Sequence, residues 1–238
     1  MTPSLPRPKI TVILAMTADG KISDEYGSAA RFASAADKQH LERQMAQMDA
    51  VLFGAETLRA YGSSLVITQP ALLAERESQG RPPQPVQIVC SATGQLDPHC
   101  RFFQQPFSRW LLTPSPEALA QWQARPQTFE HIILTPYQED GLNIHWPQTL
   151  ALLKQQGIHQ LGLLGGGQLI ASLFADDLLD FLWLTLCPYW VGGRLAPTPL
   201  GGIGLPLNQA QGLELLSAAT IDQEVFLHYR FWPRSPSA

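Results

Sequence analysis

The chain has 238 residues, of which 45% are hydrophobic and 15% are charged, and its formal net charge is −4. This composition is typical of a globular protein, and the length suits one large domain or two small ones. The negative charge argues against nucleic acid or an anionic membrane surface as the main partner, although it is compatible with a local basic pocket for a small phosphorylated ligand.

The cysteines indicate a reducing compartment. Cys90, Cys100 and Cys187 are odd in number and form no C-x-x-C pair, so neither a disulfide framework nor a zinc site is expected. The N-terminus lacks the apolar stretch of a signal peptide, and no segment reaches the roughly 18 apolar residues of a membrane span. We therefore expect a cytoplasmic protein with no membrane segment and no bound metal.

Short apolar runs alternate along the chain with segments of helical periodicity. The first expected strand covers residues 10–16 and is followed by a turn signal at Asp19 and Gly20. Ser34 is expected to cap a helix that carries Asp37 in its first turn. Further strands are expected over residues 50–54, 86–90, 110–113, 131–134, 161–164 and 181–186, and further helices from residue 56 and over residues 71–77, 116–124, 147–156 and 168–175.

The end of the chain has a different pattern. Residues 191–206 are rich in Gly and Pro and are expected to form a loop, whereas residues 225–231 alternate in hydropathy. This alternation predicts a last strand, which we pair with residues 213–218 in an antiparallel hairpin. Buried strands that alternate with helices indicate the α/β class, with a mainly parallel central sheet flanked by helices. Because neither a repeat nor a long linker divides the chain, we expect a single domain over residues 1–238.

The most informative motif is the run of Gly165, Gly166 and Gly167, which separates an apolar strand from a helix. Adjacent glycines cost chain entropy, so a folded protein keeps them where side chains would obstruct something. At a helix N-terminus, the group that side chains would keep away is often a phosphate. Backbone N–H groups and the helix dipole bind it there. The run matches neither G-x-G-x-x-G nor the P-loop, so a phosphate-binding turn and a tightly packed turn both explain it.

Two other segments also stand where a strand ends. Ligands of α/β sheets gather beyond the carboxyl ends of the strands. Lys21 lies close after the first strand and can donate to a phosphate or hydroxyl there, although a surface lysine after an Asp-Gly turn explains it as well. Gly54 and Thr57 repeat the order strand, glycine, helix, and Thr57 can either bind a phosphate or cap the helix. Two such junctions in one sheet favour a shared ligand crevice.

Several kinds of chemistry lack their usual residues. The six histidines show no metal-ligand spacing and no evident Ser or Cys partner, and no G-x-S-x-G elbow occurs. Hydrolysis and metal-dependent chemistry are therefore not expected. A site with few acids, bases and nucleophiles suits a cofactor that carries the chemistry itself. Because the H-x-E…P-C-x-x-C signature is absent as well, we expect no zinc deaminase activity.

The three segments, in this order, resemble the riboflavin-biosynthesis pyrimidine reductase family, which is the reductase domain of the bifunctional deaminase/reductase and has the dihydrofolate-reductase-like fold. Residues 15–23 resemble the family's Met-Ser-x-Asp-Gly-Lys motif, and residues 49–57 resemble its Asp-Ala-x-x-x-Gly-x-x-Thr motif. The three glycines resemble its glycine turn, and residues 178–193 resemble the following strand and Pro-x-x-x-Gly-Gly segment. The resemblance covers about residues 8–231, which is essentially the whole chain.

The resemblance implies NADPH as the hydride donor, a homodimer, and a phosphorylated ribosylamino-pyrimidine as substrate, namely 5-amino-6-(5-phosphoribosylamino)uracil. Asp19 and Lys21 would face the substrate and the nicotinamide as the catalytic residues. Ser91 would lie near the adenosine 2′-phosphate, and the other expected cofactor contacts gather at the two glycine junctions. The full expected cofactor-binding set is Gly54, Thr57, Ser91, Gly165, Gly166, Gly167, Gln168 and Leu169.

Two segments depart from the family pattern. Leu164 stands where the family usually has Glu before its glycines, and Tyr61 begins a segment that replaces the usual Asp-x-Pro-x-Leu. Each hydrogen-bond partner that is missing in this way costs a bound polar ligand about 1–3 kcal/mol if the site is buried. A reductase of a pterin or folate-like ring, and an NADPH-binding protein without turnover, are therefore the alternatives. Arg31, Arg59 and Arg194 are candidate partners of a substrate phosphate, although a solvated surface role is the more ordinary explanation of each.

Overall fold

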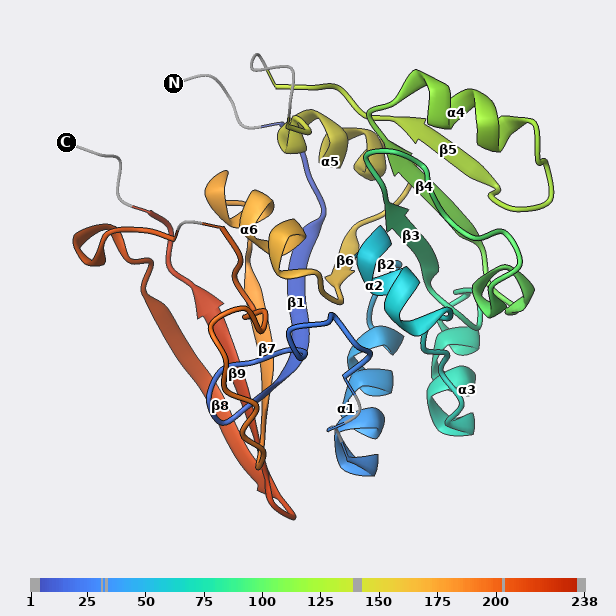
Figure 1. The fold of residues 1–238 in the computed structure, drawn as a ribbon. Helices are drawn as coiled ribbons and strands as arrows, with labels where there is room; N and C mark the ends of the chain where they lie inside the picture. Colours follow the sequence, from blue (N-terminus) through green and yellow to red (C-terminus); the bar gives the residue numbers. More distant parts are fainter. Residues whose placement is uncertain (1–4, 31, 33, 139–142, 203, 235–238) are drawn as a thin grey trace. The chain divides into compact units, whose positions relative to one another are not determined.

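The computed structural model describes residues 5–30, 32, 34–138, 143–202 and 204–234 (Figure 1). The chain forms two compact units, each built from two stretches of sequence. The first unit contains the described residues up to Lys9 together with residues 42–162. The second unit contains residues 10–41 and the described residues from 163 onward. The expectation of one domain over residues 1–238 stays a prediction.

The first unit carries strands in the order β5-β4-β3-β2-β6. β2 (Ala50–Gly54), β3 (Val86–Cys90), β4 (Arg109–Thr113) and β5 (His131–Leu134) pair in parallel, and β6 (Gln160–Leu163) follows β2 in the order. The central residues of β2, β3 and β4 are apolar and fully buried. Such continuous apolar runs are typical of parallel strands that are covered on both faces.

Helices cover the strands of the first unit. α2 (Ala55–Tyr61) packs on β2 and β3, and α4 (Pro116–Gln123) packs on β4 and β5 (Figure 1). α3 (Pro70–Ser78) and α4 both begin at Pro, whose missing N–H costs nothing in the first turn of a helix. The remaining elements are α5 (Trp146–Gln155) and the short 3-10 helix η1 (Arg101–Gln104).

The second unit carries strands in the order β1-β7-β9-β8. β1 (Lys9–Thr17) and β7 (Phe181–Cys187) are parallel. β9 (Glu224–Phe231) is antiparallel to β7 and to β8 (Leu213–Ile221), so the expected C-terminal hairpin is confirmed. A second 3-10 helix, η2 (Leu207–Gln209), precedes β8.

Two helices lie on opposite faces of these strands. His40 of α1 (Ala35–Ala46) contacts the ring of Trp183, with 4.8 Å between the ring centroids. Ile170 and Phe174 of α6 (Gly167–Ala175) line an apolar cavity of about 270 Å³ together with Leu182 and other side chains of the second unit. Successive side chains of a strand point to opposite faces. Trp183 contacts α1 and its neighbour Leu182 lies beside α6, so the two helices lie on opposite faces of β7.

Most expected elements are present with bounds that shift only slightly. The expected cap is confirmed, since Oγ of Ser34 accepts hydrogen bonds from the N–H groups of Ala36 at 3.0 Å and Asp37 at 3.2 Å. The strands are mostly parallel, helices flank them, and the C-terminal pair is antiparallel. The expected architecture is therefore confirmed.

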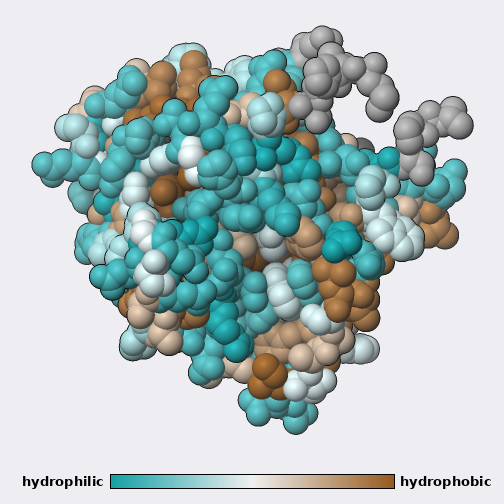
Figure 2. Space-filling view, turned by 180° about the vertical axis from the view of Figure 1, so that it is seen from behind, coloured by the Kyte–Doolittle hydropathy of each residue, from teal (hydrophilic) through white to brown (hydrophobic). Residues whose placement is uncertain are grey.

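Hydrophilic residues predominate on the face seen in Figure 2, and hydrophobic residues form separate patches on it. The large hydrophobic side chains of Trp190, Leu195 and Leu207 are exposed to solvent. Within the described ranges, no helix combines the length and apolar character needed to cross a membrane.

Candidate functional site

The three glycines connect β6 to α6, and the structure gives a reason for each of them. Gly165 has a φ of +129° and Gly166 a φ of +90°, which L side chains rarely adopt. At Gly167 the reason is space, because a Cβ would lie 2.5 Å from the carbonyl oxygen of Thr198. The conformation and packing of the turn therefore require glycine even before a ligand is considered.

The glycine turn, residues 165–167, also offers free backbone to an anion. Gly166 is the N-cap of α6, and no side chain of the described residues caps this helix. The first N–H groups of a helix have no acceptor within it, and the dipole makes this end partly positive. Within the described structure, no heavy atom lies within 4 Å of the place where a Cβ of Gly165 would stand. Phosphate binding at this turn stays a prediction, with which the packing of the turn does not conflict.

Residues 198–201 pack against the glycine turn. The N–H of Gly201 donates to the carbonyl oxygen of Gly167 at 3.0 Å. A Cβ at Gly201 would lie 3.0 Å from the side-chain amide nitrogen of Gln168. Gln168 is exposed and Leu169 is half-buried, and both belong to the first turn of α6. The five cofactor residues expected from 165 to 169 therefore lie together at one helix end.

Lys21 follows the turn after β1, and both its side chain and its backbone are held by hydrogen bonds. Its Nζ donates to the carbonyl oxygen of Ala196 at 3.2 Å, and its N–H donates to Oγ1 of Thr17 at 2.9 Å. An ammonium group has three N–H donors, so two remain after the bond to Ala196. Lys21 can therefore donate to a ligand oxygen without leaving its place.

Asp19 lies in the same turn and accepts several hydrogen bonds. The hydroxyl of Thr17 donates to its Oδ1 at 2.5 Å, the N–H of Gly192 donates to its Oδ2 at 2.6 Å, and the N–H of Val191 donates to its Oδ1 at 3.2 Å. These bonds, the one from Thr17 above all, lower the pKa of Asp19 to about 2. The carboxylate is ionised at neutral pH and holds no proton that it could donate.

Gly54 and Thr57 lie at the junction of β2 and α2 in the first unit. Gly54 is the N-cap of α2 with a φ of −78°, and none of the described side chains caps the helix. The interpretation of Thr57 as a capping residue is therefore wrong. No described atom lies within 4 Å of a Cβ built on Gly54, so the space beside this backbone is open.

Ser91 follows β3 and is buried, with 3% of its surface exposed. Its Oγ accepts a hydrogen bond from the N–H of Gly94 at 3.0 Å, and the indole of Trp122 donates to the carbonyl oxygen of Gly94 at 2.7 Å. The hydroxyl thus stabilises the turn after β3 and can still donate its own proton. Its contact with a 2′-phosphate stays a prediction.

The two departures from the family pattern have different surroundings. Leu164 is half-buried between β6 and the glycine turn. Tyr61 ends α2 and is 47% exposed. In the segment that follows Tyr61, Oγ of Ser64 donates at 2.6 Å to Oε1 of Gln87, which is fully buried. This segment therefore pairs a buried amide of the first unit.

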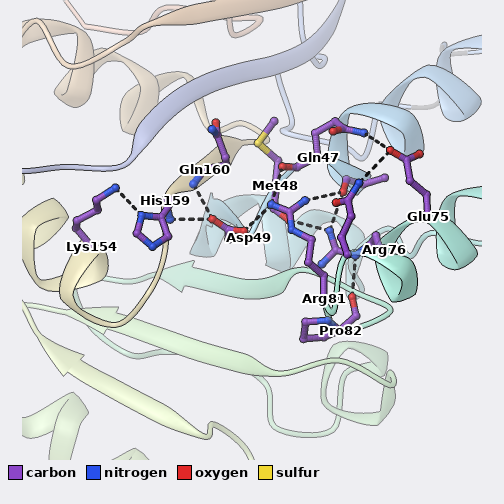
Figure 3. Close-up of polar contacts among 12 residues, drawn as sticks. Gln47, Met48, Asp49, Glu75, Arg76, Arg81, Pro82, Lys154, His159 and Gln160 are labelled. Carbon is purple, nitrogen blue, oxygen red and sulfur yellow. Dashed lines mark hydrogen bonds and ion pairs between the residues drawn. The ribbon is translucent and has the colours of Figure 1, made fainter.

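Figure 3 shows Asp49, the first residue of the motif that ends at Thr57. Its Oδ2 accepts hydrogen bonds from the N–H groups of His159 and Gln160, both at 2.8 Å, and its Oδ1 forms an ion pair with Arg81 at 2.6 Å. Asp49 precedes β2 and Gln160 begins β6, so this carboxylate joins the starts of two strands. It lies at the other end of β2 from Gly54 and has a structural role.

A buried polar cluster in the second unit was not predicted from the sequence. Glu224 is 3% exposed and accepts hydrogen bonds from the N–H and the hydroxyl of Ser34, and Sγ of Cys187 lies 3.5 Å from its Oε1. Asp37 accepts a hydrogen bond from Thr185, and burial, with the charge of Glu224, raises the pKa of Asp37. Burial also raises the pKa of Cys187 to about 12, so this thiol is not a nucleophile.

The structure adds little support for a metal site or for the three candidate arginines. In the part of the chain that the structure describes, no three His, Cys, Asp or Glu side chains are grouped so that they could hold a metal ion. Arg59 donates to the carbonyl oxygen of Gln95 at 3.1 Å, and Arg194 is exposed. Arg31 lies outside the described residues.

Comparison with known families gives a match over nearly the whole chain. The family model described as the RibD C-terminal domain matches residues 8–227, which include parts of both compact units. The 2,5-diamino-6-ribosylamino-4(3H)-pyrimidinone 5′-phosphate reductase of Archaeoglobus fulgidus is 27% identical over 196 residues, which is 82% of this chain and 87% of the relative. The protein of the same name from Methanothermobacter thermautotrophicus is 26% identical and covers 94% of this chain and 98% of the relative.

Other relatives are longer than this chain. The riboflavin biosynthesis protein RibD of Actinobacillus pleuropneumoniae is 26% identical over 94% of this chain, but the match spans only 57% of that protein. Among solved structures, a pyrimidine reductase-like protein of Corynebacterium diphtheriae has a TM-score of 0.76 at 18% identity and covers 94% of this chain and 92% of its own. RibD of Acinetobacter baumannii has a TM-score of 0.74 at 18% identity, and the match covers 95% of this chain and 58% of that protein. These structures confirm the expected fold class.

Proposed function

The chain belongs to the RibD C-terminal domain family, and on this basis we propose that it is an NADPH-dependent reductase of riboflavin biosynthesis. It would reduce the ribose of a ribosylamino-pyrimidine 5′-phosphate to a ribityl chain. Two relatives carry the name of such a reductase, and their matches to this chain span most of their own length. Within the chain, the observation that carries the proposal is the N-terminus of α6, where only glycines precede the helix and no described side chain caps it.

We propose that the glycine turn binds the phosphates of NADPH. The positive φ angles and the open space beside Gly165 support this role, because a phosphate oxygen can approach the backbone closely there. Gly54 and Thr57 are proposed as a further phosphate-binding point, supported by the open space beside Gly54 at the start of α2. Ser91 is proposed to donate its hydroxyl proton to the 2′-phosphate. When it is bound, NADPH supplies the hydride.

Lys21 is proposed as the main catalytic side chain. Its Nζ would donate a hydrogen bond to a substrate oxygen while it stays bonded to Ala196, so the ammonium enters the reaction already oriented. Asp19 is proposed to lie on the same side, as an ionised carboxylate that neither gives nor takes a proton at neutral pH. Leu164 would give the substrate pocket an apolar wall where the family pattern has a carboxylate.

We also propose a homodimer in the cytoplasm. The exposure of the large apolar side chains of Trp190, Leu195 and Leu207 in the second unit supports an interface between copies. β8 ends the strand order of the second unit and offers an edge that a second copy can cover. The described cysteines are free, as in a reducing compartment. Analytical ultracentrifugation tests the dimer.

The reductase activity is tested by following NADPH absorbance with three substrates in parallel. They are 2,5-diamino-6-ribosylamino-4(3H)-pyrimidinone 5′-phosphate, 5-amino-6-(5-phosphoribosylamino)uracil and dihydrofolate. We expect oxidation with one of the two pyrimidines, and the ratio of their rates identifies the substrate. Oxidation with dihydrofolate alone would make the protein a pterin-type reductase, and NADPH binding without oxidation would make it a nucleotide-binding protein.

A further inference from the structure

A continuous stretch of the second unit, residues 189–201, connects the turn that carries Lys21 to the glycine turn, and we call it the bridging segment. Near its start, the carbonyl oxygen of Tyr189 accepts a hydrogen bond of 2.9 Å from the N–H of Ala18. Further along, the carbonyl oxygen of Pro197 accepts one of 3.0 Å from the N–H of Ile22. Backbone hydrogen bonds therefore join the bridging segment to residues on both sides of Lys21.

The far end of the bridging segment contacts the other half of the candidate site. The carbonyl oxygen of Thr198 fills the space beside Gly167, and Gly201 donates its N–H to Gly167. One segment thus touches the proposed catalytic lysine and the proposed phosphate turn. The conformation of the bridging segment therefore determines the position of the carbonyl oxygen of Ala196, which accepts the hydrogen bond from Nζ of Lys21.

The side chain of Asp19 also connects the turn after β1 to the bridging segment. The carboxylate of Asp19 receives the N–H groups of Val191 and Gly192, and the hydroxyl of Thr17 orients the same carboxylate. Gly192 has a φ of +71° and Gly193 a φ of +77°, so the segment turns sharply where the carboxylate receives its N–H groups. Two backbone donors beside one carboxylate form a strong and directional contact, because the acceptor is charged.

On the basis of the proposed function, we infer that Asp19 is a positioning residue that acts through Lys21. Its carboxylate holds the bridging segment, the segment places the carbonyl oxygen of Ala196, and this oxygen holds the Nζ of Lys21. Ala196 is buried, with 4% of its surface exposed. The lysine side chain has four flexible bonds, so without this acceptor it would sample many orientations.

The first test is a double-mutant cycle with Asp19→Ala, Lys21→Ala and the double variant, using the pyrimidine substrate that the wild type turns over. We expect Asp19→Ala to lower kcat about 10- to 100-fold, the size of effect that a misplaced catalytic group causes. The double variant should be no slower than Lys21→Ala alone, because Asp19 acts only through Lys21. Rate losses that multiply in the double variant, or an unchanged kcat in Asp19→Ala, would overturn the inference.

Asp24→Asn is the matched control for these variants. Asp24 also accepts two backbone hydrogen bonds, from Tyr26 and Ser28, but both lie within its own turn and neither reaches the bridging segment. The kcat of Asp24→Asn should equal that of the wild type. Asp19→Asn provides a second variant of nearly unchanged size if Asp19→Ala does not fold, and it should lose less activity than Asp19→Ala, since one amide oxygen can still accept an N–H.

A second measurement needs no substrate. Amide hydrogen exchange, followed by NMR, should be about 10-fold faster or more at Val191 and Gly192 in Asp19→Asn than in the wild type, because these N–H groups lose their charged acceptor. Asp24→Asn should leave both rates unchanged. Equal exchange in wild type and Asp19→Asn would overturn the inference at once. If the wild type reduces none of the substrates, the proposed function fails, and the exchange rates alone decide whether Asp19 holds the bridging segment.

Discussion

Arg81 and Asp49 form an ion pair in which the guanidinium nitrogen and the carboxylate oxygen are 2.6 Å apart. The same carboxylate joins the starts of β2 and β6 through two backbone N–H groups. The motif to which Asp49 belongs therefore has its structural residue at one end of β2 and its proposed ligand-binding residues at the other. Stability and cofactor binding should be separable within this one motif.

We expect Asp49→Ala to lower the free energy of unfolding by about 2–3 kcal/mol. The change removes the acceptor of two backbone N–H groups and the ion-pair partner of Arg81 in a partly buried place. Urea denaturation measures the loss. Glu77→Ala on the exposed side of α3 is the control and should stay within about 0.5 kcal/mol of the wild type. A change that small in Asp49→Ala would contradict the structural role.

Gly165→Ala and Gly157→Ala separate backbone strain from ligand binding. Both glycines have positive φ, +129° and +88°, and no described atom lies within 4 Å of a Cβ built on either. Each substitution should cost about 1–2 kcal/mol of stability, because an L side chain disfavours this conformation. Only Gly165→Ala should also weaken NADP binding, by about tenfold or more if one hydrogen bond to a phosphate is removed. Isothermal titration calorimetry compares the two, and equal affinities would remove the glycine turn from the cofactor site.

Lys21→Ala should lower kcat by about 10²–10³-fold, the usual effect of removing one donor that stabilises charge in a transition state. NADP affinity should change little, since the proposed phosphate-binding residues lie elsewhere. Steady-state kinetics and titration with NADP measure the two quantities. Lys154→Ala is the control, because it removes a half-buried lysine of α5 whose Nζ lies 2.6 Å from Nδ1 of His159, and it should keep the wild-type kcat. A similar decrease in both variants would show that the effect is not specific to Lys21.

The buried cluster around Glu224 predicts a pH effect on stability. Burial first, and then the charge of Glu224, raise the pKa of Asp37, so the folded chain keeps a proton that the unfolded chain releases above about pH 4. Stability therefore falls as the pH rises from this value to the raised pKa. Asp37→Asn removes the titration, so its stability relative to the wild type should increase between about pH 4 and pH 7. Urea midpoints across this range test the effect, and a difference that does not vary with pH would contradict it.

Local signals account for what the sequence predicted well. The cap at Ser34 is made with N–H groups two and three residues later, and the expected strands are short apolar runs whose burial follows from composition. The contacts that organise the candidate site are different. Gly192 donates to Asp19 across 173 positions, and Lys21 donates to Ala196 across 175. Such pairs depend on the tertiary fold, and a single sequence carries no periodicity that would predict them.

The glycine turn shows the same limit. Its sequence allowed either a packed turn or a phosphate site, and the atom that fills the space beside Gly167 comes from Thr198, far along the chain. For Thr57, residue type left capping and phosphate binding both open, and the structure places Gly54, not Thr57, at the N-cap position of α2. In both cases residue type alone did not decide between a structural and a binding role.

Transfer of deuterium from NADPH to product tests the central claim most directly. NADPH is prepared with deuterium at nicotinamide C4 in two forms, one for each face of the ring, and each is incubated with the purified protein and the preferred pyrimidine phosphate. We expect one of the two forms to yield a ribityl product that carries the deuterium, seen by mass spectrometry. A product without deuterium from either form would show that the hydride does not come from NADPH and would contradict the account.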